Sequence, residues 1–380
     1  PDGPQVERAE RLEVVDHASL VPVMAAPSTL DLRAPDPAMP SGEQVFDFSF
    51  SRRLHRGQVV LDDYNPDHPA LNLQVMSPDP EDGDQSSARR RPDEQYHYPG
   101  DYPLAEQGKL LARTRREAEQ AAAAGGEGRS DCARLAAGSW FTLKGSDDSE
   151  DSYMLAEVRH LGDKSTEDLE GGALDRRLSY ENHFNCVERA APYRPPRVTP
   201  RPSVQGVQTA LVVGHGEEEI STDKQGRVMV RFRWDRLGAS AGESSCWVRV
   251  SQIMAGAGWG AIWIPRAGQE VVVAFEQGDP DRPLITGCLY HAHHLPPFGL
   301  PKQKSRSGFR TSSTPGGRGH NELSFEDRAG AEVVRLRGQR DLRVRAGNDH
   351  TTTVRRDQTI TVEKGNRSVG VLAGDLTEDV

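Results

Sequence analysis

The chain has 380 residues and a net charge of −10, from 47 basic and 57 acidic residues, and 35% of its residues are hydrophobic. This length predicts two or three domains, each able to bury its own core, and the apolar content excludes a wholly disordered chain. The longest apolar runs, such as Val271 to Phe275, are too short to span a bilayer, which needs about 20 residues. The acidic balance argues against a general binder of nucleic-acid phosphates.

The four cysteines predict neither a zinc site nor a redox pair, because no two of them form a CxxC motif. We expect all four to be reduced and mostly buried: Cys132, Cys186, Cys246 and Cys288. The chain starts at Pro1 and shows no basic segment followed by an apolar one. Either no signal peptide exists or the natural start of the chain is missing.

Two segments of the first 100 residues alternate apolar and polar residues. Phe46, Phe48 and Phe50 alternate with polar residues after Val45, and the same pattern runs from Leu71 to Val75. A period of two predicts half-buried strands. Residues 78–94 are rich in Asp, Glu, Ser and Arg and predict a solvated loop.

One helix is predicted, from about Pro103 to Ala124, where Gly125 and Gly126 end it. Its apolar face is thin, with Leu104, Leu111, Arg115 and Ala118. Further strands are predicted from Trp140 to Lys144, Tyr153 to Leu161 and Leu178 to Val187.

Five prolines between Ala191 and Pro202 predict a domain boundary. Short antiparallel strands then follow without any long helix between them, which favours a small closed barrel such as the OB fold, with its last turn at residues 278–283. The predicted strands are Gly206 to Val213, Gly226 to Trp234, Cys246 to Ser251, Val271 to Glu276 and Leu284 to Tyr290.

After Pro297 the composition changes to a linker rich in Gly, Ser and Pro and then to short strand-like units. Asp349 and Asp357 are eight residues apart, as are Val354 and Val362. Each repeat supplies one strand with almost no large side chain, since Phe325 is the last aromatic residue, and such a strand cannot bury a face alone. The repeats therefore predict oligomerisation.

Few motifs suggest chemistry. Residues 238–242 match the GxSxG nucleophile pattern, but the strand and helix that such a serine requires are missing there, which favours a loop. The cluster of His291, His293 and His294 allows a metal site or a solvated linker, and His215 to Glu217 is interpreted as a turn. Paired carboxylates for glycoside cleavage remain open, because the sequence does not show their separation. Asn366 to Ser368 is a formal glycosylation sequon that means little without a secretory signal.

A nucleic-acid groove on the barrel would need aromatic residues among basic ones. The barrel segment contains Trp234, Trp247, Trp259 and Trp263. However, Trp234 is predicted on the apolar face of its strand, and Trp259 and Trp263 belong to an apolar Gly-rich run. We interpret the alternating arginines after Glu332 as a solvated face of a fibre: Arg335, Arg337, Arg340, Arg343 and Arg345.

Several ordered motifs resemble VgrG, the spike protein family of bacterial type VI secretion systems. They are Asp223 to Arg236 (DKQGRVMVRFRWDR), Ser244 to Val250 (SSCWVRV), Gly260 to Phe275 (GAIWIPRAGQEVVVAF), Gly278 to Gly287 (GDPDRPLITG), Asn321 to Asp327 (NELSFED) and Tyr96 to Gly100 (YHYPG). The resemblance thus extends over most of the chain.

The resemblance implies a mainly β protein in three parts. A partial β-rich tail-hub-like domain would occupy residues 1–200, with its helix near 103–124, and an OB-fold barrel residues 205–290. A linker, 291–319, would lead to the start of a trimeric triple-stranded β-helix at 320–380. We expect the chain to lack the first part of the family's hub and the end of its shaft, and any effector domain would lie beyond residue 380.

The implied function is mechanical: a homotrimeric spike that punctures target envelopes and carries effectors, without catalytic residues, cofactor or metal. The resemblance also implies an Hcp tube at the hub end, a PAAR-repeat protein at the tip, effectors with their adaptors, and export from the bacterial cytoplasm to the extracellular space or a target cell. Neither nucleic-acid binding nor stable membrane insertion is expected. The alternatives are a phage-type spike with envelope-degrading activity and an OB-fold nucleic-acid module. A prophage-like particle remains as open as a secretion system.

Overall fold

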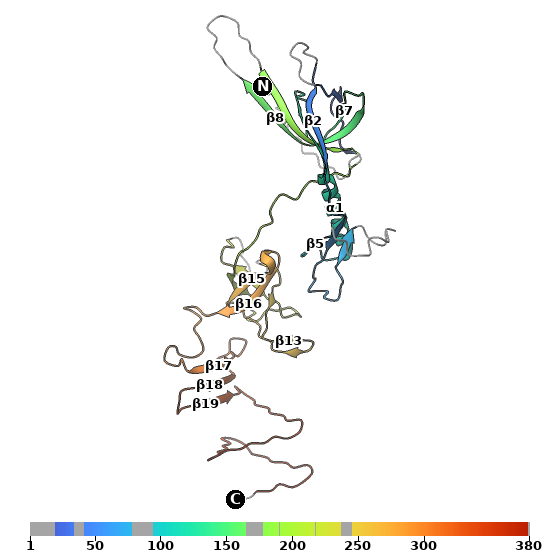
Figure 1. The fold of residues 1–380 in the computed structure, drawn as a ribbon. Coiled ribbons are helices and arrows are strands. Elements are labelled where there is room, and N and C mark those ends of the chain that lie inside the picture. Colours follow the sequence, from blue (N-terminus) through green and yellow to red (C-terminus); the bar gives the residue numbers. More distant parts are fainter. Residues whose placement is uncertain are drawn as a thin grey trace, which may run out of the picture. The chain divides into compact units, whose positions relative to one another are not determined.

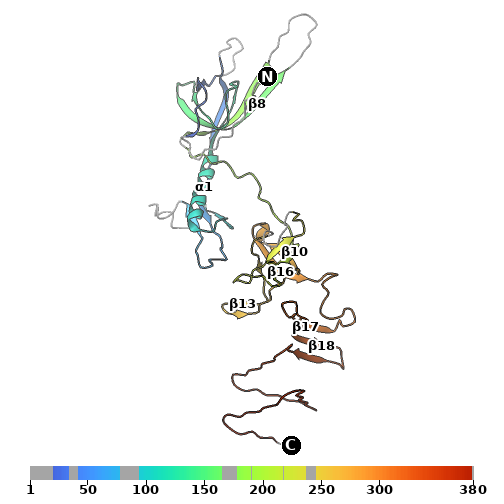
Figure 2. The ribbon, with the colours of Figure 1, turned by 180° about the vertical axis from the view of Figure 1, so that it is seen from behind.

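A computed structural model of the chain describes residues 20–33, 42–77, 94–164, 178–189, 191–216, 218–236 and 245–378. The chain divides into two compact units, Pro1–Pro200 and Arg201–Val380 (Figures 1 and 2). The architecture is mainly β, as predicted, and α1 (Ala105–Ala123) is the single α-helix in the described ranges. A search of those ranges finds no helix with the length and hydropathy of a membrane span.

The larger sheet of the first unit, called the hub sheet here, has six strands in the order β1-β7-β8-β9-β6-β2 (Figure 1). A bridge between Leu32 and Val45 joins its two edges, so the sheet curls around one core that includes Phe141, Leu155 and Phe184. Its strands are Thr29–Asp31 (β1), Val45–Arg52 (β2), Ala124–Ser130 (β6), Trp140–Lys144 (β7), Glu150–Lys164 (β8) and Leu178–Glu188 (β9).

A second, smaller core lies between α1 and the sheet β4-β3-β5. Its strands are Gln58–Leu61 (β3), Val75–Ser77 (β4) and Glu94–His97 (β5). Tyr102 is buried in this core and donates a hydrogen bond to the carbonyl oxygen of Leu73 at 2.5 Å. The strand predicted from Leu71 begins only at Val75, because the preceding backbone carries Leu73 into the core without pairing.

Two expectations for the helix are wrong. Leu104 and Leu111 are exposed, and the buried positions of α1 are mainly small ones such as Gly108, Ala112 and Ala121, because the helix packs closely against a small sheet. The helix also does not end in a glycine turn. It passes directly into β6, so Gly125 and Gly126 are strand residues.

The second unit begins with a five-stranded barrel in the order β11-β10-β15-β16-β12. Paired backbone hydrogen bonds between Val228 and Val248 join β11 to β12 and close it. One pair, β12 with β16, is parallel, which corrects the expectation of antiparallel strands throughout. The strands are Gln208–Val213 (β10), Met229–Phe232 (β11), Arg249–Val250 (β12), Glu270–Phe275 (β15) and Pro283–Leu289 (β16).

After the barrel comes a three-stranded antiparallel sheet, called the neck sheet here, of β17 (Arg306–Arg310), β18 (Glu322–Glu326) and β19 (Val333–Arg337). The sequence predicted a linker where β17 lies. Its apolar side chain Phe309 pairs with Leu323 on β18, so the segment is a strand and not a free connection.

The loop between β17 and β18 is fastened to the barrel. Thr314 donates its hydroxyl to Glu219 at 2.6 Å, and the Gly316 N–H donates to the same carboxylate at 2.6 Å. The rings of Trp263 and Phe309 stack with centroids 5.3 Å apart. The barrel and neck sheet are therefore joined by direct contacts.

The cysteines are all free. Cys132 and Cys186 are buried, as predicted, but Cys246 and Cys288 are exposed on the barrel. The prediction of buried thiols fails there because a small barrel has a thin core, built from eight buried residues, and leaves much of each strand outside.

Candidate functional site

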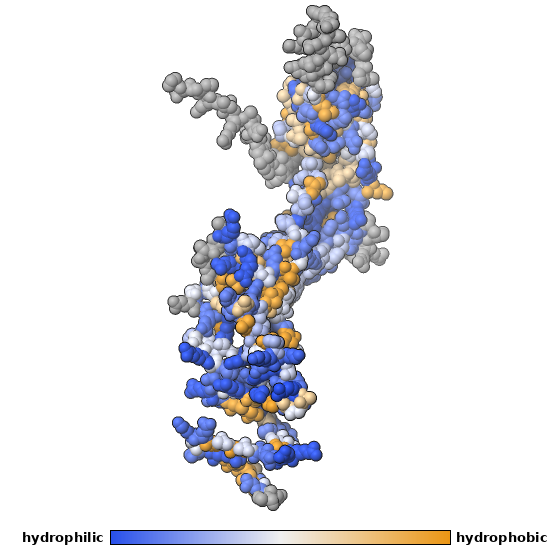
Figure 3. All heavy atoms as spheres, turned by 90° about the vertical axis from the view of Figure 1, so that its left-hand side faces the viewer, coloured by the Kyte–Doolittle hydropathy of each residue, from blue (hydrophilic) through white to orange (hydrophobic). Residues whose placement is uncertain are grey.

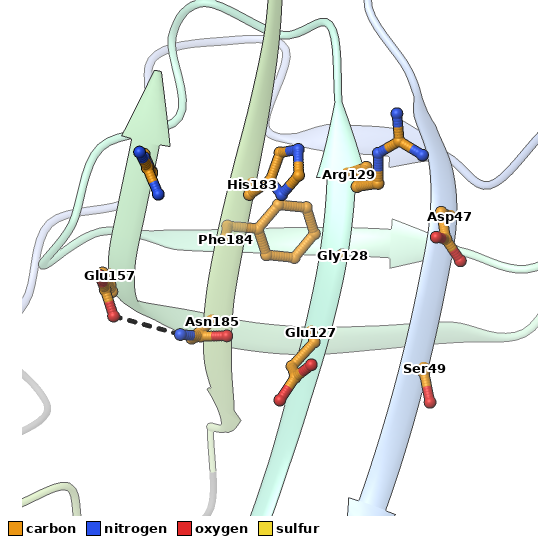
Figure 4. Close-up of a pocket in the computed structure, with 10 residues that line it drawn as sticks. Asp47, Ser49, Glu127, Gly128, Arg129, Glu157, His183, Phe184 and Asn185 are labelled. Atoms are coloured by element: carbon orange, nitrogen blue, oxygen red, sulfur yellow. Dashed lines mark hydrogen bonds between the residues drawn. The ribbon is translucent and has the colours of Figure 1, made fainter. Parts of the chain in front are cut away.

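A polar groove of about 410 Å³ crosses the outer face of the hub sheet (Figure 4). Four strands supply its side chains, in two rows that the register aligns. The first row holds Arg159, His183, Arg129 and Asp47, and the second holds Glu157, Asn185, Glu127 and Ser49.

Hydrogen bonds tie the groove residues together across strands. Arg129 donates to both carboxylate oxygens of Glu181, at 3.0 and 2.7 Å, and His183 Nε2 lies 2.7 Å from the same group. The Arg129 guanidinium holds the pKa of Glu181 below its usual range. Asn185 donates to Glu157 at 3.2 Å (Figure 4).

The groove does not have the geometry of a serine-hydrolase site. Ser49 and His183 lie on β2 and β9 with β6 between them, so their strands are about 10 Å apart, too far for a serine to give its proton to this histidine. Glu127 and Glu157 are likewise separated by β9. Both side chains are exposed to solvent. The groove presents hydrogen-bonding groups to solvent.

Among the described residues, the motifs singled out in the sequence do not form a common site. The GxSxG segment and Glu217 lie outside the described residues. The ring of His215 packs edge-on against Trp247, with centroids 6.3 Å apart. The histidines after the barrel form a tight turn in which the backbones of His291 and His294 hydrogen-bond to each other. Within the described ranges, no three His, Cys, Asp or Glu side chains are grouped as metal ligands.

The tryptophans of the barrel are mostly exposed. Trp234 lies beyond the end of β11 and is 67% exposed, which corrects its predicted place on an apolar strand face. Its ring stacks on Phe232 and its Nε1–H donates to Gln208 at 2.9 Å. Trp259 projects from the hairpin formed by β13 (Ala255–Gly256) and β14 (Trp259–Gly260) and is also exposed.

The neck sheet has an unusual division between its faces. On one face, Glu322 and Ser324 of the central strand are buried, and Arg306 donates to Glu322 at 2.5 Å while lying over the ring of Phe298. On the other, a set of aligned apolar side chains remains largely exposed: Phe309, Leu323, Phe325, Val334 and Leu336. The central strand thus buries its polar side chains, and most of the apolar face is exposed apart from the contact of Phe309 with Trp263. A core formed within one chain would bury the apolar side chains instead.

Beyond β19 the chain is extended. Residues 341–378, all described, form no strand and no backbone-to-backbone hydrogen bond, and every one of them is exposed. Figure 3 shows apolar and polar side chains in alternating bands along this part. Extended strands with open backbone groups are stable only when other strands pair with them. We call residues 338–378 the shaft segment.

The sequence of β17 contains little signal for a strand. Phe309 is its one apolar residue, and one residue does not make an alternating pattern. The glycines and serines around it therefore favoured a linker.

Comparison with protein families finds three ordered matches. Residues 4–166 match the phage tail baseplate hub (GPD), and residues 210–290 match the type VI secretion system/phage-baseplate injector OB domain. Residues 307–379 match the bacteriophage T4 gp5 C-terminal trimerisation domain, which contains the neck sheet and the shaft segment.

Curated relatives match most of the chain. It is 40% identical over 327 residues to the type VI secretion system spike protein VgrG5 of Pseudomonas aeruginosa, covering 84% of this chain and 40% of that protein. It is 37% identical over 344 residues to VgrG1b of the same organism, covering 89% and 44%. A solved Escherichia coli type VI secretion component, c3393, superposes with a TM-score of 0.38 at 22% identity, covering 69% of this chain and 49% of that one. The chain spans less than half the length of the curated relatives it matches.

Proposed function

Because this chain belongs to the VgrG family of type VI secretion system spike proteins, we propose that three copies of it assemble into part of such a spike. The exposed apolar face of the neck sheet is the observation that carries this proposal. It offers each copy a surface for the next, and the shaft segments then pair their open backbones between chains. Each chain would supply one strand in every layer.

The proposed role is mechanical. A shaft of strands paired between chains has no free sheet edge and resists bending, which suits a body that is pushed through an envelope. The polar groove of the hub sheet supports this choice over serine-type catalysis, because Ser49 and His183 lie on strands that β6 separates. We propose that the chain itself degrades no envelope polymer.

We further propose the partners that membership of this family implies. The hub at residues 1–200 would contact an Hcp tube, a PAAR-repeat protein would cap the far end of the shaft, and effectors with their adaptors would be carried along the spike. The barrel at 205–290 and the shaft start at 320–380, preceded by strand β17 of the neck sheet, would complete the chain. The protein would leave the cytoplasm on the apparatus and reach the extracellular space or a target cell.

The mass in solution tests the trimer. Light scattering coupled to size exclusion should give the mass of three chains for the 380-residue protein and of one chain for a version ending at Tyr290. That version keeps the hub-sheet core and the barrel core intact, since neither cluster uses residues beyond Ile285.

A substitution in the full chain tests assembly without removing any residues. Phe325→Asp places a charge on the apolar neck face and should give a monomer, whereas Val198→Asp, at an 80% exposed valine outside the neck, should remain trimeric. A full chain that is monomeric at micromolar concentration, or a Phe325→Asp variant that is still trimeric, would contradict the proposal. Cleavage of purified peptidoglycan by the full chain would contradict the mechanical role.

A further inference from the structure

The charge of the chain is unevenly distributed. Residues 302–345 contain 11 basic and 5 acidic residues, a net charge of +6. The rest of the chain contains 36 basic and 52 acidic residues, a net charge of −16. One short segment is therefore strongly cationic in an acidic protein.

The arginines of the neck sheet are arranged around a carboxylate that already has its partners. Arg310 and Arg337 flank Glu322 in the same cross-strand row. Glu322 accepts hydrogen bonds from Arg306 at 2.5 Å and from the hydroxyl of Ser324 at 2.7 Å. Arg335 and Arg337 are exposed, and no described carboxylate forms an ion pair with either one. Their charges are available to a ligand.

The arginines of β19 are followed by further arginines in the shaft segment, at the eight-residue spacing of its repeats. Arg335 and Arg343 are eight residues apart, and so are Arg337 and Arg345. In a stacked repeat, residues one period apart would lie above each other, so Arg343 and Arg345 would continue the arginines of β19 as two short cationic rows. An acidic row with the same spacing, Asp341, Asp349 and Asp357, extends further, so the surplus of positive charge is confined to the start of the shaft.

We propose that residues 302–345 form a cationic collar that binds the phosphate groups of an anionic membrane surface. Guanidinium groups match phosphate oxygens with paired hydrogen bonds, and juxtamembrane basic residues are attracted to anionic leaflets. The collar goes beyond the proposed spike function but gains from it, because three copies bring three such segments together around one shaft.

Lipid phosphate fits this surface better than nucleic acid. Sequence-tolerant binding of single strands uses aromatic side chains on which bases stack. The two aromatic residues of the collar, Phe309 and Phe325, lie on the opposite face of the neck sheet from Arg335 and Arg337, and Phe309 already stacks on Trp263. The cationic face therefore offers charge without a stacking platform.

Vesicle flotation with the full 380-residue chain tests the collar. Binding to vesicles of about two parts phosphatidylcholine to one part phosphatidylglycerol is expected at low salt, with little binding to pure phosphatidylcholine and release at high salt. Changing Arg335, Arg337, Arg343 and Arg345 together to Gln should weaken binding at least about tenfold, since each basic residue near an anionic surface is worth about fivefold. The four matching Arg→Lys changes should keep most of it.

A matched control removes the same charge elsewhere. Arg33, Arg53, Arg56 and Arg197 are exposed residues of the first unit outside the groove, and their joint change to Gln should alter binding less than twofold. Light scattering on each variant keeps the two proposals separate. If the Arg→Gln variant is monomeric, its weaker binding reports on assembly, and the binding of the Arg→Lys variant then tests the collar. Equal binding by the Gln and control variants, absence of binding by the intact chain, or tighter binding to a DNA duplex than to anionic vesicles would overturn the collar proposal.

Discussion

The hub sheet and the neck sheet are built from the same kind of strand but treat their apolar side chains in opposite ways. In the hub sheet, Phe141 and Leu155 are almost fully buried within one chain. In the neck sheet, Val334 and Leu336 are 69% and 62% exposed, and the buried side chains of the central strand are Glu322 and Ser324. The hub sheet folds by itself, whereas the neck sheet displays the surface that a core would hide.

This difference separates two tasks within one chain. Curling joins both edges of the hub sheet and lets it bury a core without help. The neck sheet has three strands with one covered face, and the shaft segment has no partner strands within its own chain. Stability of the first unit should therefore be independent of assembly, while the order of the shaft should depend on it.

Matched leucine deletions should give the largest contrast between the two regions. Leu155→Ala removes a fully buried side chain and should cost about 2 to 5 kcal/mol of unfolding free energy. Leu336→Ala removes the same atoms from an exposed position, so it should leave the first unit unchanged and weaken the association of chains.

Urea unfolding, monitored by hydrogen exchange in peptides of the hub sheet, measures the loss of unfolding free energy in Leu155→Ala. The mass of Leu336→Ala as a function of protein concentration measures its association. If Leu336→Ala destabilised the hub sheet as much as Leu155→Ala does, the two regions would not be independent. If it left the association constant unchanged, the apolar neck face would not be an interface.

Two glycines of the hub sheet give the next largest contrast. A Cβ on Gly128 would lie 2.3 Å from the ring of Phe184 and 2.9 Å from the carbonyl oxygen of Asp47, whereas a Cβ on Gly162 would meet nothing within 4 Å. Gly128→Ala should cost roughly 1 to 3 kcal/mol through overpacking. Gly162→Ala, on β8, should be neutral or slightly stabilising, because alanine restricts the unfolded chain.

Thermal unfolding of both variants provides the comparison. Equal melting temperatures would mean that the ring of Phe184 moves aside at little cost and that the hub core is less tightly packed than its burial indicates.

The sequence predicted well those elements whose pattern is local. Alternation predicted the strand from Trp140 to Lys144, and α1 differs from its predicted bounds by only one or two residues. Features that depend on distant partners were predicted poorly. The exposed leucines of α1 follow from packing against β3 and β4, and the parallel pairing of β12 with β16 follows from barrel closure.

The groove on the hub sheet illustrates the same limit for a site. Asp47, Arg129, Arg159 and His183 come from four strands that are far apart in the sequence, and only the strand register brings them into one row. The repeats after Phe325, in contrast, are visible in the sequence because their period is local. The sequence therefore predicts an assembly surface but no pocket.

The smallest expected effect concerns acid and the polar face of the neck sheet. The hydroxyl of Ser324 and the guanidinium of Arg306 lower the pKa of Glu322 below its ordinary value of 4.5, although burial opposes them. A carboxyl whose pKa is lowered by folding stabilises the folded state above its ordinary value, and this contribution is lost as the pH falls through the folded value. The contribution of Glu322 should therefore be constant between pH 7 and 5 and be lost below about 4.5.

Hydrogen exchange at β18, corrected for the intrinsic effect of pH on exchange, measures this loss in the intact chain. Glu322→Gln keeps the shape of the side chain but not its charge. It should cost about 1 kcal/mol at neutral pH and reduce the acid-dependent step at β18 to the part that belongs to Glu326, whose pKa the Ser305 hydroxyl lowers. Glu218→Gln, which removes the charge of a carboxylate on the barrel, provides the control and should keep that step. An acid step of unchanged size in Glu322→Gln would assign the whole step to other carboxylates. The polar face of the neck sheet would then be stabilised more by packing against Phe298 than by the charge of Glu322.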